Sequence, residues 1–184
     1  MALRVVTPPE PVVTWDEAKA HLRVEDDEEQ NYVEGLIKAA TAHIDGPSGW
    51  LQRAIGVQTL EWTGHCFPTG EFDLPIGPVI SIESIGYTDG SGSVQNLAEG
   101  AWVQADDWLR PAHGTSWPSV RSERGAASVT YVAGYQAVPA DIKLAILMGV
   151  AALHANRGDQ PIESAIGPKS AAGSLLSSYK VWRL

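Results

Sequence analysis

Apolar residues recur every three to four positions in three stretches of the chain, which is the spacing of one helix face. The pattern predicts helices at about 14–23, 28–45 and 139–157. Thr14 and Glu17 have the spacing of a capping box, which favours a helix start at this point. The third predicted helix is apolar on nearly every side, so it requires neighbours on both faces. Its second apolar stripe consists of Leu144, Leu147, Val150 and Ala151.

Between the second and third helices the pattern changes from helical spacing to strands and turns. From about residue 57 to residue 135, short stretches rich in Val, Ile, Thr and aromatic residues are separated by turn sequences such as DGSG at 89–92. We therefore predict an α+β protein: a short antiparallel helical bundle with an inserted antiparallel β-rich subdomain. The second stripe of the third helix then packs either on this subdomain or on a neighbouring subunit.

The two ends of the chain lack a clear period. Pro8, Pro9 and Pro11 predict that residues 1–13 form an extended arm before a main domain at 14–157. Residues 158–174 are rich in small residues and predict a flexible linker. The last ten residues are apolar again, so we expect the tail at 158–184 to end in a docking segment for another protein. The candidate docking residues are Leu175, Leu176, Tyr179, Lys180, Val181, Trp182, Arg183 and Leu184.

Charge and cysteine content narrow the possible partners. The chain has 184 residues and a formal net charge of −9, which argues against broad phosphate binding. The single cysteine, Cys66, excludes an internal disulfide and a cysteine-based zinc site within one chain. The start of the sequence has no apolar signal core, and no apolar run approaches the roughly 20 residues that span a bilayer. We expect a protein that is made in the cytoplasm and stays there, or becomes part of a particle assembled there.

The sequence contains no strong candidate for a catalytic, metal-binding or phosphate-binding site. The acidic run at 25–29 is better explained by the start of a helix than by a metal site, because acids there offset the helix dipole. His65 and Cys66 are neighbours in a predicted strand, so their side chains point to opposite faces and a nucleophile–base pair is disfavoured. The sequence GPKS at 167–170 lacks the Gly-Lys-Ser order of a phosphate loop. We predict no enzyme activity, no cofactor and no metal.

Two alternative functions are each suggested by a single feature of the sequence. Tryptophans in the β-rich segment are typical of a small-ligand or carbohydrate-binding β-module with helical flanks, and a ligand would then change the tryptophan fluorescence. These residues are Trp62, Trp102, Trp108 and Trp117. A hydrolase that uses His65 and Cys66 is the other rival, and Cys66→Ala would abolish its activity.

Three motifs occur in a specific order along the chain. They are T-x-x-E-A-K-x-H-L-R-V at 14–24, LPxGPVxSIxSIxYxDxxG at 74–92 and VxYxAGYxxVPxDIKxAIL at 129–147. In this order they resemble the head–tail connector family of long-tailed bacteriophages, also called adaptor or head-completion proteins. The resemblance covers roughly residues 12–157. Proteins of this family also occur in prophages and in gene transfer agents.

The resemblance implies a structural role in a virion or phage-like particle. Family members form a ring, usually of twelve copies, that lies under the portal, extends the DNA channel and meets a stopper or head–tail joining protein. DNA passes through the channel without sequence-specific binding. The carboxy-terminal segment commonly docks on the portal protein, which would make the candidate docking residues portal contacts. The second stripe of the third helix would then lie at the subunit interface.

Overall fold

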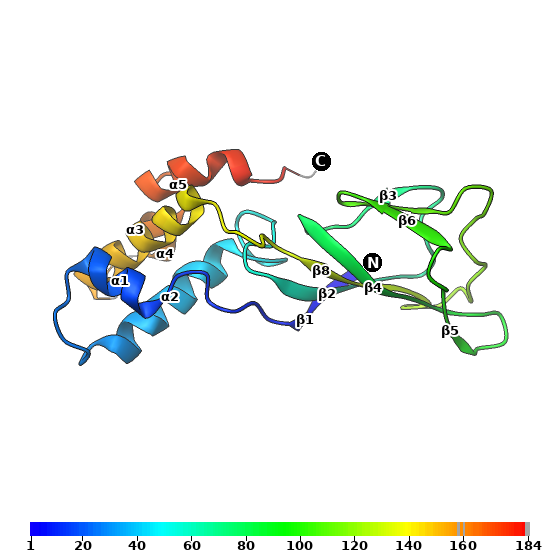
Figure 1. The fold of residues 1–184 in the computed structure, drawn as a ribbon, viewed down its shortest axis with the longest axis horizontal. Coiled ribbons are helices and arrows are strands. Elements are labelled where there is room, and N and C mark those ends of the chain that lie inside the picture. Colours follow the sequence, from blue (N-terminus) through cyan, green and yellow to red (C-terminus); the bar gives the residue numbers. More distant parts are fainter. Residues whose placement is uncertain (158, 160, 183–184) are drawn as a thin grey trace. The chain divides into compact units, whose positions relative to one another are not determined.

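The computed structural model describes residues 1–157, 159 and 161–182. The chain divides into two compact units (Figure 1). The β unit consists of Met1–Pro9 and Val57–Gly134, and the helical unit consists of Glu10–Gly56 and the chain from Tyr135 onward. The predicted α+β class is confirmed, with helices in one unit and two antiparallel sheets in the other.

The β unit contains a five-stranded and a three-stranded sheet. The first has the order β1-β2-β8-β4-β5, with strands Ala2–Thr7, Gln58–Gly64, Ala127–Ala133, Val79–Thr88 and Val94–Asn96. The second has the order β3-β7-β6, with strands Phe72–Asp73, Trp108–Pro111 and Trp102–Ala105. Strands β2 and β8 alternate strictly between buried and half-buried residues, as expected for period-two strands with one face in the core. Leu60 pairs with Tyr131 in register, and both are fully buried.

The first residues do not form a free arm. Ala2–Thr7 is an edge strand whose residue Leu3 pairs with Trp62, so the expectation of an arm over residues 1–13 is wrong for this part. The prolines begin directly after the strand, at Pro8, where a missing backbone N–H no longer interrupts the ladder.

Over its described residues, the helical unit contains five α-helices and a short 3₁₀ turn. Their bounds are α1 Trp15–Leu22, α2 Gln30–Ile44, α3 Ala140–Asn156, α4 Ile162–Ile166, α5 Ala171–Leu176 and η1 Ser177–Tyr179. The predicted capping box is present, because the Thr14 hydroxyl accepts from the Glu17 amide and the Glu17 carboxylate accepts from the Thr14 amide. The three predicted long helices lie within two residues of their expected bounds.

Helix α3 is covered by elements of its own unit. Six of its residues are buried, and α2, α4 and α5 all pack against it. Val150 is fully buried in this core, whereas Leu144 is 43% exposed. The predicted role of Val150 at a subunit interface is therefore wrong for this structure, because α4 and α5 supply the neighbours that the second stripe required.

The expected flexible linker at 158–174 is also wrong where the structure describes it. Helices α4 and α5 lie there, and Ile166, Ala172 and Leu176 are buried in the core. Small residues allow the close packing: a Cβ added to Gly149 of α3 would meet Ile166 at 3.1 Å. Over the described residues, no helix is both long and apolar enough to cross a membrane.

Candidate functional site

The chain after α5 runs along a surface formed by the segment that follows α2 and by Tyr135, which lies between β8 and α3. We call Trp50, Leu51, Arg53 and Tyr135 the tail seat. Arg53 Nε donates to the Tyr179 carbonyl oxygen at 3.0 Å, and the Val181 amide donates to the Leu51 carbonyl oxygen at 3.1 Å. Arg53 Nη1 also donates to the Tyr135 hydroxyl at 3.4 Å. These contacts fix the backbone of the tail at two positions.

Two aromatic rings contact the side chain of Lys180, the residue between Tyr179 and Val181. The Lys180 ammonium lies 4.8 Å from the centroid of the Trp50 ring and 4.6 Å from that of Trp182. Such contacts are attractive because the face of an aromatic ring is electron-rich. Trp50 belongs to the tail seat and is packed against the core, whereas Trp182 is 78% exposed. The arrangement therefore presents one large apolar ring to solvent on an anchored segment.

Tyr179 lies at the start of the same segment. Burial raises the pKa of its phenol, and the negative charge of Asp141 adds to the effect. The phenol consequently keeps its proton well above neutral pH and acts as a neutral group.

The predicted docking residues differ in how far the structure exposes them. Leu176 is fully buried in the helical core, so it is not available as an exposed docking side chain. Leu175, Tyr179, Lys180 and Val181 are half-buried, and Trp182 is exposed. Arg183 and Leu184 lie outside the described residues. The sequence analysis missed Trp50 and Arg53, whose role depends on contacts with residues more than 120 positions away.

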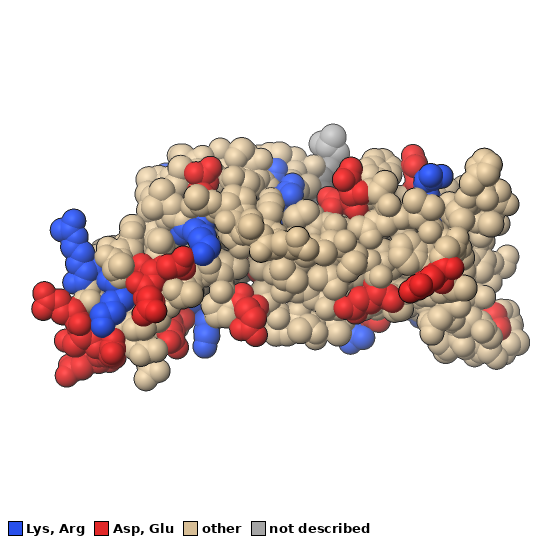
Figure 2. All heavy atoms as spheres, in the orientation of Figure 1, with Lys and Arg blue, Asp and Glu red and all other residues tan. Residues whose placement is uncertain are grey.

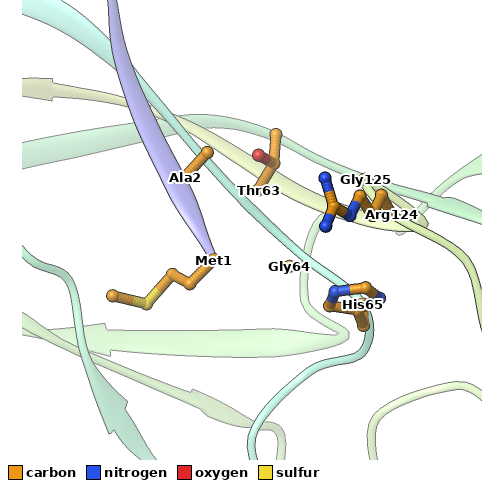
Figure 3. Close-up of a pocket in the computed structure, with 7 residues that line it drawn as sticks. All are labelled: Met1, Ala2, Thr63, Gly64, His65, Arg124 and Gly125. Carbon is orange, nitrogen blue, oxygen red and sulfur yellow. The ribbon is translucent and has the colours of Figure 1, made fainter.

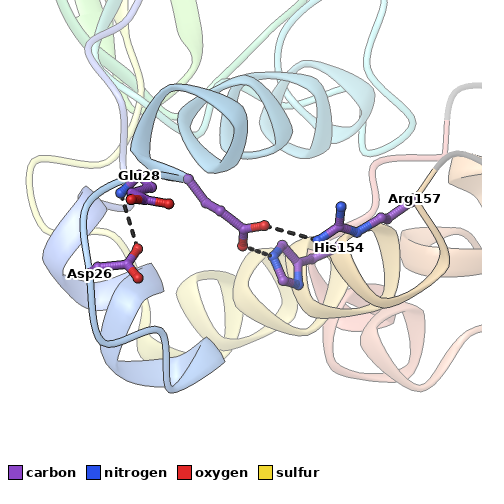
Figure 4. Close-up of polar contacts among 5 residues, drawn as sticks. Asp26, Glu28, His154 and Arg157 are labelled. Carbon is purple, nitrogen blue, oxygen red and sulfur yellow. Dashed lines mark hydrogen bonds and ion pairs between the residues drawn. The ribbon is translucent and has the colours of Figure 1, made fainter.

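A second polar group joins the start of α2 to the end of α3 (Figure 4). The Glu29 carboxylate contacts His154 Nε2 at 2.8 Å and Arg157 Nη2 at 2.9 Å. The hydrogen bond from His154, with the charge of Arg157, lowers the pKa of Glu29. Figure 4 also shows the Asp26 carboxylate accepting from the Glu28 amide.

The acidic run therefore serves local structure. Asp27 pairs with Lys19 at 2.6 Å, and Asp26 and Glu29 are engaged as described. Figure 2 shows acidic side chains gathered at the end of the helical unit that carries the α1–α2 connection. Within the described residues, no three His, Cys, Asp or Glu side chains are grouped so that they could hold a metal ion.

The tryptophans of the β unit serve mainly its core. Trp62 is 3% exposed and lies against Phe67 and Phe72, with ring centroids 6.4 and 5.3 Å away. Trp117 stacks on Phe67 at 4.9 Å and donates its indole N–H to the Gly70 carbonyl oxygen. Trp108 is 45% exposed but belongs to no aromatic pair found among the described residues. Trp62 and Trp117 therefore belong to one aromatic cluster with Phe67 and Phe72, and Trp102 is half-buried on β6.

The DGSG sequence forms a hairpin turn, as predicted, between β4 and β5. Asp89 accepts from the hydroxyl and amide of Ser91 and from the amide of Ser93. These hydrogen bonds lower the pKa of Asp89 to about 2, and the bond from the Ser91 hydroxyl contributes most to the shift. The carboxylate therefore closes the turn itself.

No protein-family model matches the chain, and no curated protein matches it in sequence. Solved structures do match its fold. The chain is similar to one in the structure described as "Neck of empty GTA particle computed with C6 symmetry", with a TM-score of 0.77 and 22% identity. A second match is to the "Virion of native gene transfer agent (GTA) particle", with a TM-score of 0.79 and 21% identity.

A third match is to the "Neck of native GTA particle computed with C12 symmetry", with a TM-score of 0.72 and 21% identity. Each of the three alignments covers 100% of this chain and 97% of the other. Across its whole length, this chain therefore has the fold of chains found in gene transfer agent particles.

Proposed function

We propose that this chain is a structural component of the neck of a tailed-phage-like particle, such as a gene transfer agent. The observation that carries the proposal is the fold match. It covers the whole chain and is found with two structures of particle necks. The order of the three sequence motifs supports it independently, because those motifs resemble connector proteins. The role is structural and includes no catalytic step.

Within the neck, the chain acts as the head–tail connector. Copies form a ring under the portal, extend the DNA channel and join the capsid to a tail-side stopper or head–tail joining protein. The sixfold and twelvefold symmetry of the matched neck structures supports a ring, with twelve as the expected number of copies. The net charge of −9 suits a channel in which DNA slides, because an array of cations would hold its phosphates.

A ring contact needs two different faces on each subunit. On the helical unit, Leu144 of α3 is 43% exposed and Tyr32 of α2 is 41% exposed. Leu147 and Ala151 are half-buried beside Leu144 on the same helix. We assign Tyr32, Leu144, Leu147 and Ala151 to the subunit interface. Val150 is left out because it is buried in the core of its own chain.

The portal contact involves the tail. Trp182 offers an exposed ring, and Lys180 is positioned beside it by the tail seat. Large aromatic side chains are frequent anchors of protein interfaces. The predicted portal contacts are therefore Tyr179, Lys180, Val181 and Trp182, with Leu175 at their edge and Leu176 serving the core.

Co-purification from cells that produce the particle tests this function. The tagged full chain is compared with a chain that ends at Tyr179, which keeps the buried Leu176 and so preserves the helical core. Mass spectrometry of the full-chain sample is expected to identify a portal protein, and the shortened chain is expected to lose it. If both chains retain the portal, the connector role stands and the tail assignment is wrong. If neither retains it while both are folded, the connector role is contradicted.

A further inference from the structure

A pocket of about 310 Å³ opens at one end of the five-stranded sheet (Figure 3). It lies where β2 ends and β8 begins, within the β unit. Its walls are Met1, Ala2, Thr63, Gly64, His65, Arg124 and Gly125. The lining includes a guanidinium and an imidazole but no carboxylate, although the chain has 22 Asp and Glu residues against 13 Lys and Arg residues.

The Arg124 guanidinium has no ion-pair partner in the described part of the chain. Its neighbour Glu123 contacts Arg121 instead, at 3.4 Å. Glu61, three positions before Gly64 on β2, is held by Arg4 of β1. The carboxylates closest in sequence are thus already engaged, and the positive charge of Arg124 stays available to the pocket.

Two glycines belong to the lining of the pocket. A Cβ added to Gly64 would meet the Trp62 ring at 2.7 Å, so the buried ring beneath favours glycine at this position. Gly125 has a φ of +77°, a conformation that other residues rarely adopt. A ligand can therefore approach the backbone at Gly125, where an added Cβ would meet nothing within 4 Å, as well as the side chains of Arg124 and His65.

We propose that this pocket binds a carboxylate group. Arg124 would hold it by paired N–H donors, whose planar geometry matches two carboxylate oxygens. His65 and the Thr63 hydroxyl would complete the set of donors. A nucleic-acid backbone is disfavoured because it requires several cations in a row, and the side chains of this pocket supply one guanidinium and one imidazole in an acidic chain.

The carboxylate comes from an acidic side chain of a neighbouring protein. The pocket is open at the surface, so a side chain that another protein presents can reach it. This source rests on the proposed function, since a neck component meets several other chains. The preference for a carboxylate rests only on the residues of the pocket.

The test is a titration followed by amide NMR, in which the full chain is mixed with N-acetylglutamate at constant ionic strength. We expect saturable shifts at Gly64, His65 and Gly125. Arg124→Gln should weaken binding about tenfold, as expected for loss of a charged hydrogen-bond donor. Arg110→Gln, which changes an exposed arginine elsewhere in the β unit, should leave it unchanged. A short peptide with one glutamate should bind at least as tightly as N-acetylglutamate.

Shifts that do not saturate, or shifts that persist unchanged in Arg124→Gln, would overturn the proposal. Tighter binding of inorganic phosphate or of a short DNA duplex than of N-acetylglutamate would also overturn it, in favour of a phosphate site. Binding of N-acetylglutamate without binding of the peptide would contradict the protein source alone. Because the titration needs no particle, its outcome is independent of whether the chain co-purifies with a portal.

Discussion

The Lys180 ammonium lies 4.8 Å from the centre of the Trp50 ring, although 130 positions separate the two residues. The same ammonium lies 4.6 Å from the centre of the Trp182 ring, so the cation is close to two aromatic rings. The contact joins the last described residues to the segment after α2 and determines how the exposed Trp182 is presented. Anchoring of this kind reduces the entropy that a docking segment loses on binding.

Removal of the Trp50 ring should loosen the tail. In Trp50→Ala, amide exchange at Val181 is expected to become about fivefold faster, which corresponds to a contact of about 1 kcal/mol. Hydrogen exchange with mass spectrometry measures this. Trp108→Ala, which changes an exposed tryptophan of the β unit, serves as the control and should leave exchange at Val181 unaltered. Equal exchange in both variants would show that the ring does not hold the tail.

Gly173 of α5 lies against the backbone of Gly167, and an added Cβ would collide with the Gly167 carbonyl oxygen. Gly173→Ala should therefore lower the free energy of unfolding by about 1–3 kcal/mol, as overpacking does elsewhere. Gly35→Ala is the matched control, because the added methyl meets nothing within 4 Å on α2 and should stabilise by about 0.5–1 kcal/mol. Urea unfolding followed by circular dichroism distinguishes the signs, and a stabilised Gly173→Ala would refute the packing described for α5.

The capping box at the start of α1 gives a third prediction. Thr14→Ala removes the hydroxyl that accepts from the Glu17 amide at 3.2 Å and should cost about 1 kcal/mol. Thr14→Ser keeps that hydroxyl and should change stability little. Chemical denaturation of the three proteins measures the difference. A Thr14→Ser variant as unstable as Thr14→Ala would mean that the methyl group, and not the cap, stabilises the helix.

The ion pairs of Glu29 should make stability depend on pH in the acid range. Because His154 and Arg157 lower the pKa of Glu29 in the folded state, the folded protein prefers the ionised carboxylate more than the unfolded chain does. The stabilisation is present above the ordinary glutamate pKa of about 4.3 and is lost as pH falls through the lower folded value.

Glu29→Gln should therefore be less stable than the original protein at pH 7, and the difference should shrink towards pH 3. Thermal unfolding across this range measures it. Glu28→Gln is the control, because the Glu28 carboxylate takes part in no ion pair among the described residues. A Glu29→Gln deficit that stays constant with pH would contradict the assigned ion pairs.

The sequence predicted the elements whose signal is local and periodic. The stripes of α1, α2 and α3 and the alternation of β2 and β8 each occur within one segment, so the burial of one face could be inferred directly. The short helices α4 and α5 have no such period. They form because Ile166, Ala172 and Leu176 find apolar neighbours in the core, which is information that only the tertiary fold contains.

The candidate site was predicted in part for the same reason. An apolar tail with Trp182 at its end was visible in the sequence, but its seat was not. Arg53 and Trp50 are ordinary residues of a connecting segment until the fold brings the tail to them. Likewise, β1 was read as an arm because its pairing with β2 joins positions about 60 residues apart.

Electron cryomicroscopy of particles purified from producing cells tests the central claim most directly. The chain would carry a compact tag at its amino-terminal end, and a chain ending at Tyr179 would be analysed beside it. We predict tag density in a ring at the neck for the full chain and none for the shortened chain. Particles with complete necks but no tag density, from cells in which the tagged full chain is folded and abundant, would contradict the assignment of this protein to the neck.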